Sequence, residues 1–236
     1  MSKNRFETYK EVFDHSTEKT IYKLANDGYI DLLIGIISTG KEGNVFLAKN
    51  HLGKEVAVKI YRIETSNFQN MWKYINGDRR FENIKKTKKS IVNVWAQKEF
   101  KNLKLAEKAG LNVPKPIISR NNILIMDFIG ENEKSAPIAK NNPPRNPKKW
   151  LKKVLNMIND LYQKAGLIHG DLSEYNILNY KEEPYFIDFG QGVLKDHPIA
   201  EELLKRDIKN ISKWFKKQNV EVEESKKIYK RIIKDV

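Results

Sequence analysis

Residues 168–190 read IHGDLSEYNILNYKEEPYFIDFG, and this stretch decides the fold. Two acids, Asp171 and Asp188, each follow a short apolar run, and the amide of Asn176 comes five positions after the first acid. A phosphoryl-transfer site needs a carboxylate that orients the attacking hydroxyl and accepts its proton, and it needs oxygen ligands that hold magnesium against nucleotide phosphates. These three side chains can supply both.

Each piece of this stretch also has a purely structural explanation. Asp171 could cap a turn, His169 could be a satisfied core histidine, and Asp188-Phe-Gly could end an ordinary strand. The order of the pieces, with the two acids seventeen positions apart, favours a catalytic site, because His-x-Asp-x-x-x-x-Asn followed by Asp-Phe-Gly is a protein-kinase signature. We therefore expect phosphoryl-transfer chemistry here.

A lysine upstream points to the same chemistry. Lys59 ends the apolar run VAVK, where its ammonium would be costly unless anions meet it. Nucleotide phosphates and a carboxylate are the expected anions. Helical spacing supplies the carboxylate, because Glu99 falls on the apolar stripe of a helix predicted over residues 91–109. Glu99 could instead lie at the rim and pair with a helix lysine such as Lys98 or Lys101.

A glycine-bearing turn is predicted between two strands, residues 29–37 and 45–48. Its sequence, STGKEGNV, matches a Gly-x-Gly-x-x-Gly-x-Val pattern whose first glycine is replaced. Such a turn is common in ordinary hairpins, but the lysine downstream favours a phosphate-binding lid, since glycine backbone can approach phosphate closely. The lid residues would be Ser38, Gly40, Lys41, Gly43 and Val45.

Periodicity and turn residues predict the remaining elements. A helix capped by Ser16 or Thr17 is expected within residues 14–28. In a hairpin over residues 117–128, Met126 would line a base pocket, and the backbone of Asp127 and Ile129 would hold the adenine edge. Further helices are expected over residues 150–165, 199–217 and 228–233, after a loop over residues 131–147.

The expected fold is an α+β, trimmed two-lobed protein-kinase-like fold, with an N-lobe antiparallel sheet plus one helix and a mostly helical C-lobe. Only 46 residues follow Asp-Phe-Gly, so no activation segment is expected. The parts would be an N-terminal helical extension (1–28), an N-lobe (29–130) with its hinge at 127–130, and a C-lobe (131–236). Residues 62–90 would be a mobile insertion, part of which packs through Trp72 and Tyr74.

Composition bounds the class of protein. The chain has 236 residues and no cysteine, which allows a full core, excludes disulfides and favours a reducing compartment. No apolar run approaches the ~20 residues that a bilayer span requires, so we expect a soluble, cytoplasmic protein without a membrane partner.

The net charge of +14 makes RNA a plausible polyanionic partner, although lysine-rich faces could merely be solvated. No DNA partner is expected. The basic residues cluster at 79–89 and at Lys148, Lys149, Lys152 and Lys153. The clusters lack the aromatic interleaving that is typical of single-strand binding platforms, which favours contact with the RNA backbone over reading of bases.

Five segments together resemble the Rio family of atypical protein kinases, and most of all its first subgroup. They are STGKEGNV (38–45), VAVK (56–59), SIVNVWAQKE (90–99), HGDLSEYN (169–176) and IDFGQ (187–191). The resemblance implies a serine/threonine kinase or ATPase that depends on ATP and on Mg (or Mn), phosphorylates itself and acts in maturation of the small ribosomal subunit. Its partners would be ATP and the small-subunit precursor with its RNA.

The resemblance also implies a role for single residues. Asp171 would be the base or the hydroxyl-orienting acid, while Asn176 and Asp188 would hold magnesium. Lys59 would contact the phosphates, and Glu99 would fix Lys59. Asp188 is also implied as a phosphate acceptor, which would give an aspartyl-phosphate and hence ATP hydrolysis.

The sequence departs from the family pattern at one position, and two alternative functions are also compatible with parts of it. Gly43 stands where the subgroup commonly has alanine, which we expect to alter lid flexibility more than chemistry.

Small-molecule phosphotransferases of the aminoglycoside or choline kinase type share His-Gly-Asp-x-x-x-x-Asn, but they need an acidic carboxy-terminal pocket, and this tail is short and basic. The third reading, a non-catalytic scaffold that binds pre-ribosomes, does not explain why every catalytic position is filled.

Overall fold

The computed structural model describes residues 13–64 and 67–234, which form an α+β fold in two compact units. Of these described residues, the first unit comprises 13–64, 67–75, 83–100 and 116–128, and the second comprises 76–82, 101–115 and 129–234. The break after residue 128 falls in the segment expected as a hinge. Residues 76–82 and 101–115, expected in the N-lobe, instead pack with the second unit.

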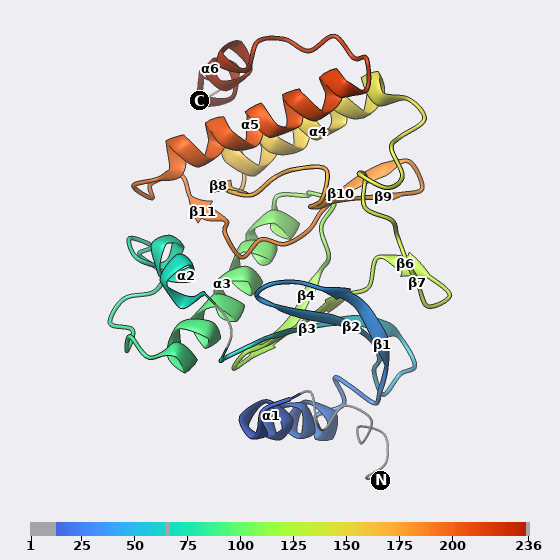
Figure 1. Cartoon of the computed structure of the whole chain (residues 1–236), viewed down its shortest axis with the longest axis vertical. Coiled ribbons are helices and arrows are strands. Elements are labelled where there is room, and N and C mark those ends of the chain that lie inside the picture. The colour runs from blue at the N-terminus through green and yellow to red at the C-terminus, as the bar shows by residue number, and fades with distance from the viewer. Residues whose placement is uncertain (1–12, 65–66, 235–236) are drawn as a thin grey trace. The chain divides into compact units, whose positions relative to one another are not determined.

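A five-stranded antiparallel sheet forms the centre of the first unit (Figure 1). Its strand order is β1-β2-β3-β5-β4, where β1 is Leu32–Thr39, β2 Gly43–Lys49, β3 Glu55–Tyr61, β4 Pro116–Arg120 and β5 Ile123–Asp127. The β2–β3 turn is closed by Asn50, whose side-chain oxygen accepts from the backbone N–H groups of Leu52 and Lys54 at 3.0 Å. Local turn chemistry therefore sets this register.

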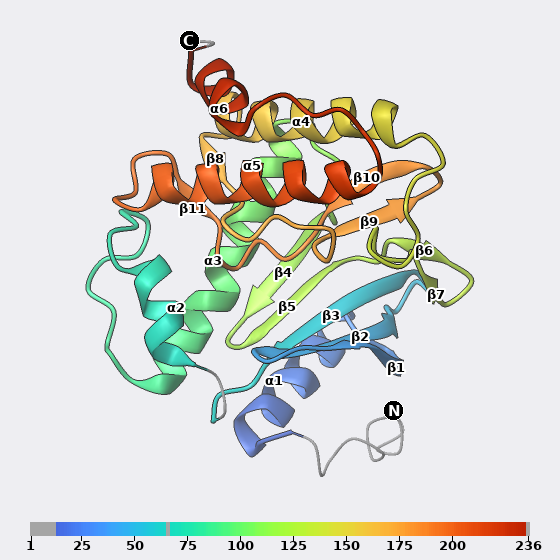
Figure 2. The same cartoon turned by 45° about the horizontal axis from the view of Figure 1, so that its top comes forward.

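Helix α1 (His15–Asn26) covers one face of this sheet (Figures 1 and 2). Side chains alternate between faces along a strand, so Val58 and Ile60 point to the same side and join Ile21 and Leu24 of α1 in one core cluster. The N-cap of α1 is Asp14, which accepts from the N–H groups of Ser16 and Thr17, and not either of the residues expected.

The long helix α3 (Lys88–Lys108) belongs to the first unit up to Phe100. A shorter helix, α2 (Phe68–Ile75), lies beside it within the predicted insertion, and the rings of Tyr74 and Trp95 are 5.9 Å apart. Met71, Tyr74 and Ile75 are buried. The sequence analysis predicted no helix within residues 62–90, so α2 was not anticipated, whereas Tyr74 packs as predicted.

Three helices dominate the second unit, namely α4 (Pro147–Gln163), α5 (Ala200–Lys217) and α6 (Ser225–Lys234). Trp150 of α4 and Trp214 of α5 meet edge to face at 6.0 Å, and α6 packs against both helices (Figure 2). Short strand pairs complete the unit: β6 (Gly130–Glu131) with β7 (Lys134–Ser135), β8 (Leu167–Ile168) with β11 (Val193–Leu194), and β9 (Ile177–Tyr180) with β10 (Glu183–Phe186).

None of the helices within the described ranges is long and apolar enough to pass through a bilayer.

Candidate active site

The first unit contains a buried ion pair between β3 and α3. Lys59 Nζ lies 3.0 and 2.9 Å from the two carboxylate oxygens of Glu99, and Glu99 is completely buried. Glu99 is thus not a rim residue. A buried pair of this kind is costly to desolvate, so its geometry has to be good, and removing one partner strands the other charge.

Strand register shows which other side chains share a face with Lys59. Val45 of β2 and Leu124 of β5 lie directly opposite Lys59, and Ala57 lies opposite Met126. Paired residues project from the same side of a sheet, so these side chains lie on the face opposite the one that α1 covers. Ala57 and Leu124 were not predicted as site residues, although the two-residue period of the strand from Lys59 identifies Ala57.

The glycine-bearing turn joins β1 to β2. Ser38 is paired with Val45, the Gly40 N–H donates to the Gly43 carbonyl at 2.8 Å, and Lys41 is exposed. Glu42 accepts a 3.0 Å hydrogen bond from the indole N–H of Trp95, which ties the turn to α3.

Gly43 has a role different from the expected one. A Cβ at this position would lie 2.3 Å from the carbonyl oxygen of Ile60, a separation that atoms do not adopt without backbone movement. Close approach of β2 to β3 therefore requires glycine here. The structure gives Gly43 this packing role, which was not anticipated when its departure from alanine was assigned to lid flexibility.

The predicted adenine-binding residues lie at and after the end of β5. Met126 is buried, and the Asp127 carboxylate accepts from Lys54 Nζ at 2.7 Å. Ile129 belongs to the second unit, where its carbonyl accepts from the Ala136 N–H at 2.9 Å. The Asp127 side chain and the Ile129 carbonyl are thus already hydrogen-bonded within the protein, so recognition of a base would fall to the other backbone groups of these residues.

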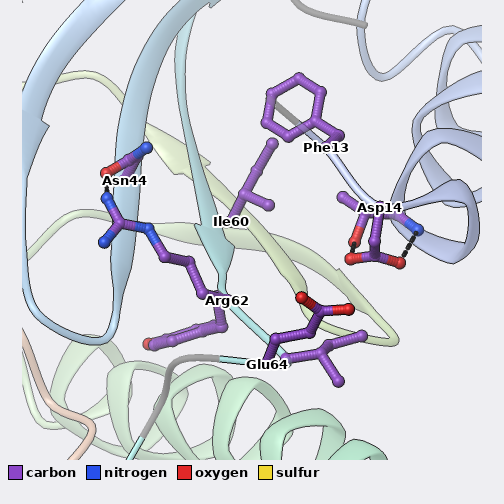
Figure 3. Close-up of a pocket in the computed structure, with 9 residues that line it drawn as sticks. Phe13, Asp14, Asn44, Ile60, Arg62 and Glu64 are labelled. Carbon is purple, nitrogen blue, oxygen red and sulfur yellow. Dashed lines mark hydrogen bonds between the residues drawn. The ribbon is translucent and has the colours of Figure 1, made fainter. Parts of the chain in front are cut away.

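A separate hollow of about 170 Å³ lies between the start of α1 and the edge of the sheet (Figure 3). Figure 3 shows Arg62 directed toward Asn44, to whose Oδ1 it donates at 2.7 Å, with Asp14 and Glu64 across the hollow. None of its lining residues was predicted to bind nucleotide. The hollow is therefore distinct from the Lys59–Glu99 pair.

The second unit contains the loop that carries Asp171. Asn176 Nδ2 donates to the Asp171 carbonyl at 2.8 Å and to its Oδ2 at 3.2 Å, and Gln191 Nε2 donates to the same Oδ2 at 3.3 Å. Burial raises the pKa of the Asp171 carboxyl, and the negative charge of Asp188 raises it further, while Arg206 and the hydrogen bond from Asn176 lower it. The carboxylates of Asp171 and Asp188 therefore lie close enough to influence each other electrostatically.

The backbone on both sides of Asp171 is held by α5. The buried carboxylate of Asp207 accepts from the N–H groups of Gly170 at 2.7 Å and Leu172 at 2.9 Å. Burial raises the pKa of Asp207 to about 7, against the effect of these two hydrogen bonds. Asp207 was not predicted from the sequence, although it falls on the apolar stripe of its helix, just as Glu99 does on α3.

Asp188 has a left-handed backbone conformation with φ of 64°, unusual for a residue that is not glycine, and its side chain is exposed. The turn around it is fixed by Asn102, which is buried and donates at 2.8 Å to the carbonyls of both Phe189 and Gly192. His169 is a satisfied core histidine, because its Nε2 contacts the Ile187 carbonyl at 2.9 Å and its ring packs on Phe189.

Asn176 and Asp188 suit magnesium, which prefers oxygen ligands. The Asn176 amide nitrogen is engaged with Asp171, and none of the described residues donates to its Oδ1, so that oxygen is available to a cation. The exposed Asp188 carboxylate offers a second hard ligand. Within the described ranges, no group of three or more His, Cys, Asp or Glu could hold a metal ion, and magnesium commonly takes its other ligands from phosphates and water.

Comparison with known proteins gives consistent matches over most of the chain. A family model described as the RIO domain matches residues 44–228. The RIO-type serine/threonine-protein kinase Rio1 of Haloferax volcanii is 44% identical over 93% of this chain and 76% of its own length. The Rio1 of Methanocaldococcus jannaschii is 42% identical over 95% and 77%, and human serine/threonine-protein kinase RIO1 is 36% identical over 91% and 39%.

Among solved structures, the Rio2 kinase–ADP/Mg2+–phosphoaspartate complex from Chaetomium thermophilum superposes with a TM-score of 0.66. The match covers 91% of this chain and 66% of that one at 24% sequence identity, so it bears on the fold alone. It confirms the kinase-like α+β class predicted from the sequence.

Proposed function

The chain belongs to the RIO domain family, and we propose that it is an atypical serine/threonine protein kinase that uses ATP and magnesium. The observation that carries this proposal is the hydrogen bonding of Asp171. Its Oδ2 accepts two amide N–H groups, whereas none of the described residues donates to Oδ1. A base that takes a proton from a serine or threonine hydroxyl needs such a free oxygen.

The predicted residues of the ion pair, the base pocket and the metal site then have distinct tasks. Lys59, held by Glu99, binds the phosphates, and Val45 and Met126 present an apolar surface to the base. Asn176 and Asp188 hold magnesium, which when bound neutralises charge on the phosphates. We infer that the residues of both units act on one ATP, because neither the lysine pair nor the aspartate loop alone supplies all parts of a phosphoryl-transfer site.

In the transfer of the γ-phosphoryl group, the proton of the acceptor hydroxyl is taken up by a side chain of this protein. As the acceptor oxygen bonds to the γ-phosphorus, its proton moves to Oδ1 of Asp171, and the bond from the γ-phosphorus to the bridging oxygen breaks to release ADP. The raised pKa of Asp171 makes the carboxylate a better proton acceptor than an ordinary aspartate.

The direct test is incubation of the purified chain with magnesium and γ-labelled ATP. We expect label in the protein itself or in an added serine/threonine substrate, and about a thousandfold less with Asp171→Ala. Asp160→Ala, on α4 where the carboxylate pairs with Lys164 one turn on, is the matched control and should behave as the original chain. Equal labelling by the original chain and Asp171→Ala contradicts the proposal.

An ATPase activity through Asp188 is the finer part of the proposal. The exposed carboxylate could attack the γ-phosphorus and release ADP, and water would then hydrolyse the aspartyl-phosphate; the Rio2 neighbour is described with a phosphoaspartate. An acyl phosphate is labile to hydroxylamine, whereas phosphoserine and phosphothreonine are not. Hydroxylamine-resistant label throughout the time course would restrict the activity to the kinase reaction.

We also propose the small ribosomal subunit precursor and its RNA as cytoplasmic partners, supported by the basic charge. The exposed Lys148, Lys149 and Lys152 of α4 are better candidates for RNA contact than the 79–89 cluster, because Arg79 pairs with Asp196 and Arg80 with Asp78. Each Lys→Ala substitution that removes one bond to an RNA phosphate should reduce the salt slope of RNA binding by about one. An unchanged slope would remove α4 from the RNA-binding surface.

The two alternative functions make different predictions in the same assays. A small-molecule phosphotransferase would transfer label to choline or an aminoglycoside and not to protein, and the family match argues against this class. A non-catalytic scaffold would bind precursor particles equally well with Asp171→Ala and with ATP omitted.

A further inference from the structure

Gln191, directly after Asp-Phe-Gly, donates one of the two hydrogen bonds to Asp171 Oδ2, but no task in the reaction has been assigned to it so far. Its amide lies between two charged groups: Nε2 donates to Oδ2 of Asp171 at 3.3 Å, and Oε1 accepts from Nη2 of Arg206 at 3.4 Å. Arg206 also donates to the carbonyl of Gly170, the residue before Asp171. Gln191 therefore connects the loop that bears the base to helix α5.

The backbone fixes where Gln191 lies. Pairing of Ile168 with Val193 in β8 and β11 places Gly170 opposite Gln191 when the antiparallel register is continued by two residues. Gly170 has φ of 80°, and a Cβ there would lie 2.7 Å from the Gln191 carbonyl oxygen. The two segments are thus in direct backbone contact, and the Gln191 side chain starts from a fixed position beside Asp171.

The charges on either side fix the orientation of the amide. A carboxylate accepts only, and a guanidinium donates only, so a reversed amide would place oxygen against oxygen at Asp171 and N–H against N–H at Arg206. Glutamine fits this position because it carries one donor and one acceptor at the end of a neutral side chain.

Asn176 and Gln191 together make the two carboxylate oxygens of Asp171 unequal. Both amides donate to Oδ2, at 3.2 and 3.3 Å, and none of the described residues donates to Oδ1. Hydrogen bonds from two directions restrict rotation of the carboxylate, so the same oxygen stays available for the acceptor proton.

We propose that Gln191 is a positioning residue of the phosphoryl-transfer reaction, which holds Asp171 through Oδ2 so that Oδ1 faces the acceptor hydroxyl, while Arg206 keeps the Gln191 amide in the required orientation. This inference rests on the proposed function. Gln191 touches neither ATP nor the acceptor in this scheme, so its loss should slow the chemical step and leave ATP binding unchanged.

The test compares Gln191→Met, which keeps the length of the side chain and removes the donor, with Gln69→Met on the exposed surface of α2 as control. We expect kcat to fall about tenfold, the loss of one hydrogen bond in the transition state, with KM for ATP and the melting temperature unchanged. Gln191→Asn, which retains the amide but is one methylene shorter, should fall between the two.

A double-mutant cycle separates positioning from general damage. In an Asp171→Asn background, measured under single-turnover conditions, Gln191→Met should have no further effect on the residual rate, because the carboxylate on which it acts is gone. An undiminished kcat for Gln191→Met, or the same tenfold loss in the Asp171→Asn background, would overturn the inference while leaving the kinase proposal intact. Absence of activity in the original chain would instead overturn the proposed function, and this inference with it.

Discussion

At the scale of single residues, Lys59 and Glu99 show how sequence can locate a partner in space. The helical stripe of α3 selected Glu99, and the structure places its carboxylate at bonding distance from Lys59. The same logic applied to α5 would have found Asp207. Residue spacing could not identify Gln191, because its contact with Asp171 depends on the β8–β11 register. Nor could it reveal the need for glycine at position 43, because the 2.3 Å distance between a Cβ there and the Ile60 carbonyl oxygen depends on the three-dimensional structure.

Truncating one member of the buried pair should be more harmful than replacing both. We expect Glu99→Ala to lower the free energy of unfolding by about 3 kcal/mol, because the Lys59 charge stays buried without its carboxylate. The double variant Lys59→Met with Glu99→Leu should recover most of that stability but remain inactive. Denaturant unfolding and kinase assays measure both, and a double variant less stable than Glu99→Ala would show that packing, not charge, dominates here.

The raised pKa of Asp207 should make the free energy of unfolding depend on pH. Its pKa is about 7 in the folded chain and near 3.8 unfolded, so between these values the folded state binds more protons than the unfolded state. The stabilisation that Asp207 contributes to the folded state is therefore fully present below about pH 4. As the pH rises to about 7 it is lost, which lowers the free energy of unfolding by up to about 4 kcal/mol. Asp207→Asn should flatten the stability profile over this interval, and a profile of unchanged slope would assign the proton to another group.

At the scale of elements, the segment before α3 is better ordered than its charge suggests. Phe68, Met71, Trp72 and Ile75 recur at three- and four-residue steps, so the helical signal of α2 was present but was overlooked among polar and basic neighbours. After α2, Arg80 donates to Asp78 and to Oδ1 of Asn102 at 2.8 Å. The insertion thus reaches, through Asn102, the turn that contains Asp188.

Asn102 should therefore matter for both stability and activity. In Asn102→Ala, the buried carbonyls of Phe189 and Gly192 lose their donor, which we expect to cost about 2–3 kcal/mol and to release the turn around Asp188. Activity should fall even at temperatures where the variant is fully folded. Asn93→Ala, on the same helix in the first unit, is the comparison, and equal loss of activity in both would mean that the effect comes from α3 as a whole.

At the scale of the whole molecule, the residues proposed to bind ATP are distributed over both units, and ligand stabilisation can test whether binding of one nucleotide depends on both sets. At an ATP concentration about one hundred times the dissociation constant, with magnesium, stability should rise by about 2.7 kcal/mol, or roughly 5–10 °C in melting temperature. Lys59→Met in one unit and Asp188→Asn in the other should each remove most of this shift, as should chelation of the metal. A full shift in either variant would mean that nucleotide binds to one unit alone.

The alternation of side chains between the two faces of β3 also constrains how this strand can pair during folding. Val58 and Ile60 enter the apolar cluster beneath α1, and Lys59 between them does not. A hairpin mispaired by one position would place the Lys59 ammonium in the apolar cluster and expose Val58 and Ile60 to solvent, so the mispaired hairpin is strongly disfavoured. The same alternation that buries Val58 and Ile60 therefore keeps Lys59 on the face proposed to bind phosphate.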